Sequence, residues 1–159
     1  MTLEAKVLTV SDGVVAGTRE DLAGAAVAAR LSDHGFEVVD RQAVGDGISS
    51  VADALAEMQL GFFGLIVTTG GTGFSERDLT PEGTGLVLER EAPGLAEAMR
   101  MANPAKGRLS RGLAGIAGGC IVLNTPGSAA GAVESLDAVA DALPHALALL
   151  AGEPTDHPA

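Results

Sequence analysis

Residues 65–73 read LIVTTGGTG, and this stretch decides the fold. Its first five residues are apolar or β-branched, which predicts a short buried strand. The glycines that follow predict a turn at the end of that strand, because glycine readily adopts positive φ. A strand without polar alternation is typical of a parallel sheet that helices cover on both faces.

The same alternation of strand and helix extends over the rest of the chain. Further buried strands are predicted at 6–10 and 120–124, and another strand is predicted at 36–44. One helix is predicted from a capping-box-like start at 18–21 to about 34, and a second over 48–58. A third begins at Pro81 with Thr80 as its N-cap, and a fourth extends from Pro93 to about 102. The last helical segment covers 129–150, with a boundary or kink at Pro144. This order predicts an α/β domain with a mostly parallel sheet, and it leaves the order of the strands in the sheet open.

Length and composition indicate one globular domain. At 159 residues the chain has the usual size of a single domain, expected over 1–152 with a tail over 153–159. The net charge of −11 and the absence of Trp and Tyr disfavour binding to nucleic acid, which needs cations and stacking rings. No apolar stretch reaches the roughly 20 residues that span a bilayer, and the N-terminus lacks a secretory pattern, so no membrane association and a cytoplasmic location are expected.

The basic residues are unevenly distributed along this acidic chain. Four of the ten lie between Ala98 and Gly119, in a segment without any acidic residue. Such a segment could hold a small phosphorylated ligand, or it could be a solvated loop, and charge alone leaves both readings open. Arg108 and Arg111 in this segment could also pair with surface or subunit neighbours.

The single cysteine and the three histidines predict no reactive or metal-binding cluster. Cys120 lies in the apolar run GGCIVLN and is expected to be buried and unreactive. His34, His145 and His157 are scattered through the sequence, so surface or helix-capping roles are expected for them.

Three loops rich in Gly, Ser, Thr and Asp follow predicted strands, after Val10, Thr69 and Asn124. In a parallel sheet the carboxyl ends of the strands meet at one edge, where ligands bind. The glycine-rich loop 70–73 can point backbone N–H groups into one concavity that favours an anion, with the Thr69 and Thr72 hydroxyls as further donors. It is neither a Walker A loop nor a dinucleotide-binding motif, and it could also be a tight structural turn.

Charged side chains stand at the end of the glycine-rich loop. Arg77 can neutralise phosphate oxygens, and Asp78 can hold Mg²⁺. Together they suit phosphoryl or nucleotidyl transfer, in which positioning and charge stabilisation do most of the catalysis. The structural alternative is that Asp78 pairs with Arg77 or caps the next turn.

Four blocks of sequence carry a resemblance to a known family: KVLTVSDG (6–13), TTGGTGFSERDLTPE (68–82), LSRGLAGIAGG (109–119) and LNTPGS (123–128). Together they resemble the MoaB/Mog family of molybdenum-cofactor biosynthesis proteins, which includes molybdopterin adenylyltransferases and is similar to one domain of gephyrin. The resemblance extends from about residue 6 to 150. It implies a three-layer αβα sandwich that binds molybdopterin and forms a homotrimer or a hexamer.

The adenylyltransferase branch of this family implies a reaction and its site. The terminal phosphate of molybdopterin attacks the α-phosphate of Mg-ATP, and pyrophosphate leaves. Asp46 and Asp78 match the two catalytic aspartates, which would hold Mg²⁺ between them, although Asp46 could instead cap the helix before Ile48. A metal-insertion partner protein would take up the product. The substrate and nucleotide contacts implied by the matching motifs are Ser11, Asp12, Thr69, Gly70, Gly71, Thr72, Gly73, Arg77, Thr80, Ser110, Arg111, Pro126, Gly127 and Ser128.

The chain departs from the family pattern at several of these motifs. Gly13 stands where Arg is usual, Gly45 and Glu76 where Pro is common, and Ala129-Ala130 where Pro and a polar or basic residue follow. These departures motivate an alternative, a non-catalytic molybdopterin-binding paralogue that acts as a carrier or docking protein. A general nucleotide hydrolase is disfavoured, because no base that could activate water lies near the loop.

Overall fold

The apolar runs of the sequence form the centre of a six-stranded sheet with the order β2-β1-β3-β6-β5-β4. The structure is a computed structural model, and it describes residues 1–154 of the chain. Its strands are β1 (Glu4–Val10), β2 (Glu37–Val44), β3 (Gly64–Thr69), β4 (Arg90–Glu91), β5 (Ala114–Ala117) and β6 (Cys120–Thr125). All residues of β3 and β6 are buried, as their uninterrupted apolar sequences require.

The four strands predicted from the sequence are confirmed, and they run parallel. β1 pairs with β2 and β3, and β3 pairs with β6, each in parallel register. β4 and β5, which are two and four residues long, were not predicted from the sequence. β4 pairs antiparallel with β5, and β5 pairs antiparallel with β6. The signal for β5 was the Gly118-Gly119 pair, a typical two-residue hairpin turn, and Gly118 has φ +56° there.

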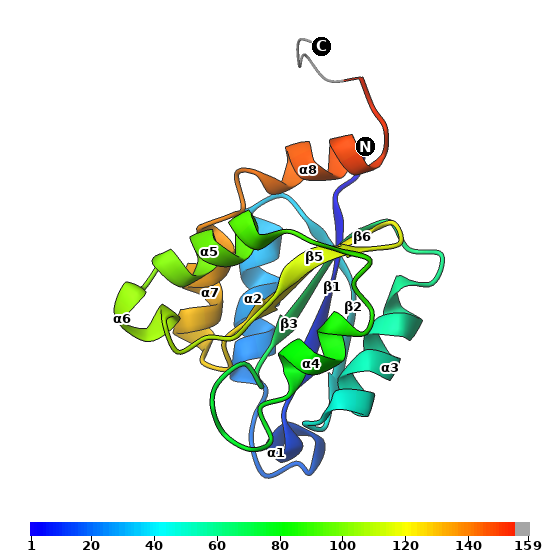
Figure 1. Cartoon of the computed structure of the whole chain (residues 1–159). Helices are drawn as coiled ribbons and strands as arrows, with labels where there is room; N and C mark the ends of the chain where they lie inside the picture. The colour runs from blue at the N-terminus through cyan, green and yellow to red at the C-terminus, as the bar shows by residue number, and fades with distance from the viewer. Residues whose placement is uncertain (155–159) are drawn as a thin grey trace.

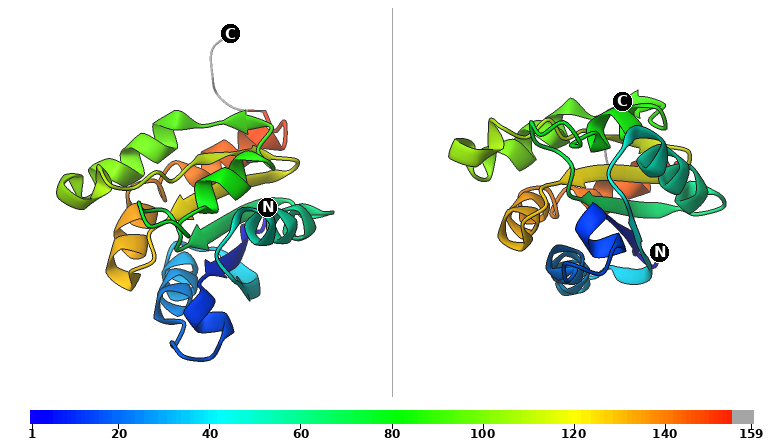
Figure 2. Two further views of the ribbon diagram at one scale, coloured as in Figure 1. Left: turned by 60° about the horizontal axis from the view of Figure 1, so that its bottom comes forward. Right: turned by 90° about the horizontal axis from the view of Figure 1, so that it is seen from below.

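Helices cover both faces of the sheet, which confirms the αβα sandwich (Figures 1 and 2). They are α1 (Asp12–Val15), α2 (Leu22–Asp33), α3 (Ile48–Gln59), α4 (Thr80–Gly85), α5 (Pro93–Met101), α6 (Pro104–Gly107), α7 (Ala129–Asp137) and α8 (Leu143–Leu150). The side chains of α2, α5, α7 and α8 pack in one core cluster, and those of α3 pack in the other. The break between α7 and α8 confirms the boundary predicted near Pro144.

Alternate residues of each central strand point to the two cores. In β1, Val7 belongs to the core under α2 and Leu8 to the core under α3, and both are at most 1 % exposed. Each such side chain contributes roughly 1.5–3 kcal/mol by leaving water. Cys120 is fully buried in the second core, and burial raises the pKa of its thiol to about 11, so its predicted burial is confirmed.

Two helix caps differ from the sequence prediction. α2 is capped by Asp21, whose side chain accepts a hydrogen bond from Gly24 N, while Thr18 Oγ1 donates to Gly13 O. The N-cap of α4 is Leu79, and Thr80 is already helical. In both cases the threonine hydroxyl expected at the cap donates to a backbone carbonyl elsewhere: Thr18 to Gly13 O, and Thr80 to Gly70 O.

Within residues 1–154, no helix is long and apolar enough to cross a membrane. Residues 155–159 of the expected tail, including His157, lie outside the described residues.

Candidate functional site

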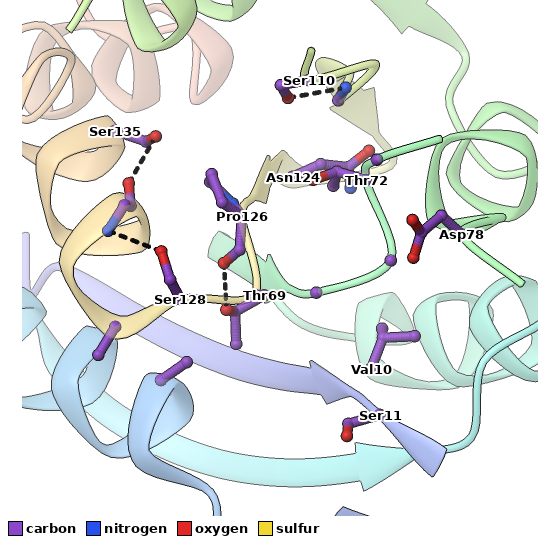
Figure 3. Close-up of a pocket in the computed structure, with 18 of the residues that line it drawn as sticks. Val10, Ser11, Thr69, Thr72, Asp78, Ser110, Asn124, Pro126, Ser128 and Ser135 are labelled. Atoms are coloured by element: carbon purple, nitrogen blue, oxygen red, sulfur yellow. Dashed lines mark hydrogen bonds between the residues drawn. The ribbon is translucent and has the colours of Figure 1, made fainter. Parts of the chain in front are cut away.

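The three loops expected at one edge of the sheet do meet there. They line a pocket of about 720 Å³ beyond the carboxyl ends of β1, β3 and β6. Figure 3 shows Asp78 on one side of this pocket and Ser128 on the other, with Ser11 and Ser110 at the remaining sides. Residues from α1, α2, α5, α6 and α7 and from the loop before α2 also line it. The pocket therefore lies where ligands bind in parallel α/β sheets.

Most of the residues predicted for the site share this pocket. Those that line it are Ser11, Asp46, Thr69, Gly70, Gly71, Thr72, Gly73, Asp78, Ser110, Pro126, Gly127 and Ser128. The remaining predicted residues, Asp12, Arg77, Thr80 and Arg111, do not line it. Each of these four instead makes hydrogen bonds that hold a lining residue in place.

The glycine-rich loop 70–73 depends on the conformational freedom of its first two residues. Gly70 and Gly71 have φ values of +102° and +68°. A Cβ on Gly70 would lie 2.3 Å from the carbonyl oxygen of Val10, so only glycine fits. The N–H groups of residues 71–73 donate to no acceptor within residues 1–154, and they remain available to an anion.

Asp46 is held by a reciprocal pair of hydrogen bonds with Asp12. Asp12 N donates to Asp46 Oδ2 at 2.9 Å, and Asp46 N donates to Asp12 Oδ1 at 3.0 Å. The N-cap of α3 is Gly47, without a side-chain hydrogen bond, so the capping alternative for Asp46 is wrong. A Cβ on Gly71 would lie 3.3 Å from Asp46 Oδ1, so the second carboxylate oxygen faces the glycine-rich loop.

Arg77 binds Asp12 with two of its nitrogens. Its Nε lies 2.6 Å from Asp12 Oδ2 and its Nη2 lies 3.1 Å from Asp12 Oδ1, and Nη2 also donates to Asp46 O. The Arg77 hydrogen bond lowers the pKa of Asp12, and the same bond raises the pKa of Arg77. The guanidinium is thus committed to anchoring the segment that carries Asp46.

Asp78 makes neither of the two local contacts that the sequence left open, because it bonds to the residue three positions before it and not to Arg77 or the next turn. Its Oδ2 accepts a hydrogen bond from Ser75 N at 2.9 Å, while its neighbour Arg77 pairs with Asp12. A Cβ on Gly73 would lie 2.9 Å from the same Oδ2, so this carboxylate also borders the glycine-rich loop. The hydrogen bond from Ser75 occupies Oδ2 of Asp78, and Oδ1 accepts no hydrogen bond in the described part of the chain.

Arg111 ties together both ends of the segment that carries Asp78. Its Nε donates to Gly73 O at 2.8 Å, its Nη2 donates to Asp78 O, and its Nη1 pairs with Glu82. The Arg111 hydrogen bond lowers the pKa of the Glu82 carboxyl. Pairing with a neighbour was one of the expectations for Arg111, and the structure shows such an ion pair, with Glu82 of the same chain.

Two buried polar side chains that join the loops complete the scaffold. Thr80 Oγ1 donates to Gly70 O at 2.9 Å. Asn124 donates from Nδ2 to Thr68 Oγ1 and Thr84 Oγ1, and its Oδ1 accepts from Leu113 N. This role of Asn124 was not predicted from the sequence, where the only indication is a single amide in the apolar run of β6.

Asp46 and Asp78 together suit a magnesium ion. Asp46 Oδ1 and Asp78 Oδ1 accept no hydrogen bond from residues 1–154. The described chain has no group of three or more His, Cys, Asp or Glu that could enclose a metal. One or two carboxylates with substrate phosphates and water form the usual ligand set of Mg²⁺, so the donor chemistry is suitable.

Fold and site together define an α/β domain with a glycine-rich loop, flanked by two carboxylates, at the carboxyl edge of its sheet. Residues 6–145 match the family described as "Probable molybdopterin binding domain". The chain therefore belongs to the molybdopterin-binding-domain family, as the sequence resemblance implied.

Named relatives cover the chain to different extents. The molybdopterin adenylyltransferase of Helicobacter pylori strain J99 is 35 % identical over 157 residues, which make up 95 % of this chain and 89 % of that protein. The molybdenum cofactor synthesis protein cinnamon of Drosophila melanogaster is 45 % identical over 91 residues, which span 54 % of this chain and only 15 % of that longer protein. The crystal structure of the molybdopterin biosynthesis enzyme MoaB from Thermus thermophilus matches with a TM-score of 0.87 and 43 % identity, over 96 % of this chain and 98 % of that one.

Proposed function

We propose that the chain is a Mg²⁺-dependent molybdopterin adenylyltransferase, which transfers the adenylyl group of ATP to the terminal phosphate of molybdopterin in cofactor biosynthesis. The observation that carries this proposal is the placement of Asp46 and Asp78 against the glycine-rich loop, each with one carboxylate oxygen uncommitted. The enzyme name of the Helicobacter pylori relative supports it.

The reaction is a nucleotidyl transfer. A phosphate oxygen of molybdopterin forms a bond to the α-phosphorus of ATP, the bond from that phosphorus to the bridging oxygen breaks, and pyrophosphate leaves with the electron pair. Such transfers depend on orientation and charge stabilisation more than on covalent help from the protein. A pocket of about 720 Å³ falls within the range of small-molecule sites and leaves room for extended phosphorylated ligands.

The chain supplies the binding and orienting groups of this reaction. The free N–H groups of residues 71–73 would hold phosphate oxygens, as such loops do elsewhere. Asp46 and Asp78 would hold Mg²⁺, which neutralises charge on two phosphorylated substrates when it is bound. The Asp12–Arg77 pair and Arg111 keep those two carboxylates at the loop.

The decisive experiment is an assay of purified chain with molybdopterin, ATP and Mg²⁺ that follows both pyrophosphate and adenylylated pterin. We expect Asp46→Asn and Asp78→Asn each to lower turnover by about 100-fold or more, because each removes one charge from the reacting centre. Asp53→Asn is the matched control, because Asp53 is exposed on α3 outside the pocket, and it should retain full turnover.

The carrier alternative predicts a different result in the same assay. Tight molybdopterin binding without pyrophosphate release by the unmodified chain would refute the transferase and favour a carrier or docking protein. Full turnover by Asp78→Asn would leave the transferase in place and remove Asp78 from its proposed role.

A further inference from the structure

The pocket is lined by more acidic than basic side chains, although its proposed substrates are anions. Five acidic residues line it: Glu20, Asp21, Asp46, Asp78 and Glu134. Three basic residues line it: Arg19, Arg100 and Lys106. A phosphorylated ligand therefore needs specific cations here, because the field of the pocket and of the whole chain, with a net charge of −11, opposes it.

Most basic residues of the chain are committed to partners within it. Arg30, Arg41, Arg77 and Arg111 form ion pairs with carboxylates. Lys6 donates to Met58 O, and Arg100 donates to Gly112 O. Within residues 1–154, the side chains without a hydrogen bond or ion pair are those of Arg19, Arg90, Lys106 and Arg108, and only Arg19 and Lys106 of these line the pocket.

Arg19 is brought to the pocket by the loop between α1 and α2. The N–H groups of Thr18 and Arg19 both donate to Gly13 O, at 3.0 and 3.1 Å, which folds the loop back over Gly13. A Cβ on Gly13 would lie 3.2 Å from the Cβ of Arg19. The missing side chain at position 13 therefore makes room for Arg19 beside Ser11, the first residue after β1.

Lys106 reaches the same pocket from the basic segment noted in the sequence. It lies in α6, four residues before the lining residue Ser110. Figure 3 shows Ser110 and Ser11 at opposite sides of the pocket, and Figure 2 shows α6 and α1 well apart. The two uncommitted cations therefore enter the pocket from separate walls.

We propose that Arg19 and Lys106 bind the phosphate groups of the anionic substrates, a role for which the sequence motif had pointed to Arg77. The identity of the anions as ATP and molybdopterin rests on the proposed function. Which cations are free, and where they lie, does not depend on that identity. An ammonium and a guanidinium on separate walls suit a ligand with phosphates at two positions.

The test is isothermal titration of the full chain with two probes, ATP and inorganic pyrophosphate. We expect Arg19→Ala and Lys106→Ala each to weaken the binding of at least one probe by about tenfold, or about 1.4 kcal/mol. The double variant should bind both probes more weakly, and the remaining affinity should depend less on salt. Arg19→Lys should recover much of the loss.

Matched controls distinguish a loss of direct phosphate contacts from misfolding and from the general loss of positive charge. Arg90→Ala and Arg108→Ala each remove an uncommitted cation that does not line the pocket, and they should leave both affinities within twofold of the unmodified chain. Arg19 and Lys106 are exposed, so melting temperatures should stay unchanged in their variants.

The outcomes distinguish this proposal from the proposed function. If the unmodified chain binds neither probe, or if the Arg19 and Lys106 variants bind as tightly as the controls, the proposal is overturned. If the two variants lose affinity while the unmodified chain shows no adenylyl transfer, the anion site stands and the transferase fails.

Discussion

At the scale of single residues, the site depends on glycines in the loop 70–73 and on side chains that hold this loop and its neighbours in place. Arg77 stands in a motif that suggests a phosphate contact and Arg111 in one that suggests a substrate contact, yet both donate to carboxylates and carbonyls of the chain itself. Their planar guanidinium groups each engage several acceptors in fixed directions, which Lys could not reproduce. They act as positioning residues for Asp46 and Asp78.

Gly70 allows a prediction at this scale. Gly70→Ala should destabilise the chain by about 3 kcal/mol or more, because it combines positive-φ strain with a backbone clash at Val10 O. Gly17→Ala is the matched control: Gly17 also has positive φ, +74°, but a Cβ there meets nothing within 4 Å, so it should cost only about 1 kcal/mol. Urea unfolding measures both, and equal losses would contradict the clash.

At the scale of elements, a charged cluster joins the C-terminal ends of α2 and α7. Arg30 binds Asp137 through Nε at 2.7 Å and through Nη2 at 3.0 Å, and His34 Nε2 lies 2.7 Å from the same carboxylate. His34 is the C-cap of α2, so its predicted place at a helix end is confirmed. Arg30 first, and then His34, lowers the pKa of Asp137.

This cluster predicts a pH-dependent contribution to stability. Because the folded pKa of Asp137 lies below its ordinary value of 3.8, its contribution is present above that pH and is lost as the pH falls through the folded pKa. Asp137→Asn should lower the free energy of unfolding at pH 7 by at most about 1 kcal/mol, since the pair is partly exposed and screened.

Urea unfolding at pH 7 and near pH 3 measures this contribution. The difference between Asp137→Asn and the unmodified chain should shrink at the lower pH, and a difference that grows there would refute the assignment. Asp141→Asn serves as the control, because Asp141 is exposed and lies outside this cluster.

At the scale of the whole molecule, exposed apolar side chains favour an oligomer, and the family resemblance implies a trimer. Leu60, Leu86, Phe74 and Met101 are each at least 67 % exposed. Burying such side chains between subunits is favourable at about 25 cal/mol per Å². Light scattering should therefore give about three times the chain mass of 15.8 kDa, and a monomer mass at micromolar concentration would contradict the trimer.

From the sequence alone came the fold class and the edge of the sheet at which the candidate site lies. Uninterrupted apolar runs such as that of β3 required a sheet buried on both faces, and the glycines after it required a loop with positive φ. These are local properties of consecutive residues, so they can be predicted without knowing the fold. The short β4 and β5 escaped because two to four residues carry too little periodicity to be recognised.

Only the tertiary structure decided which charged groups meet. Asp12 and Arg77 are 65 residues apart in the chain, and Glu82 and Arg111 are 29 residues apart, yet each pair is in contact. Local motifs assigned both arginines to ligand contacts, because a motif cannot show that an acceptor from another loop lies closer. The cations that remain for a ligand, Arg19 and Lys106, emerge only after every pairing across the folded chain has been made, because a charge acts on whatever the fold brings within a few ångströms of it.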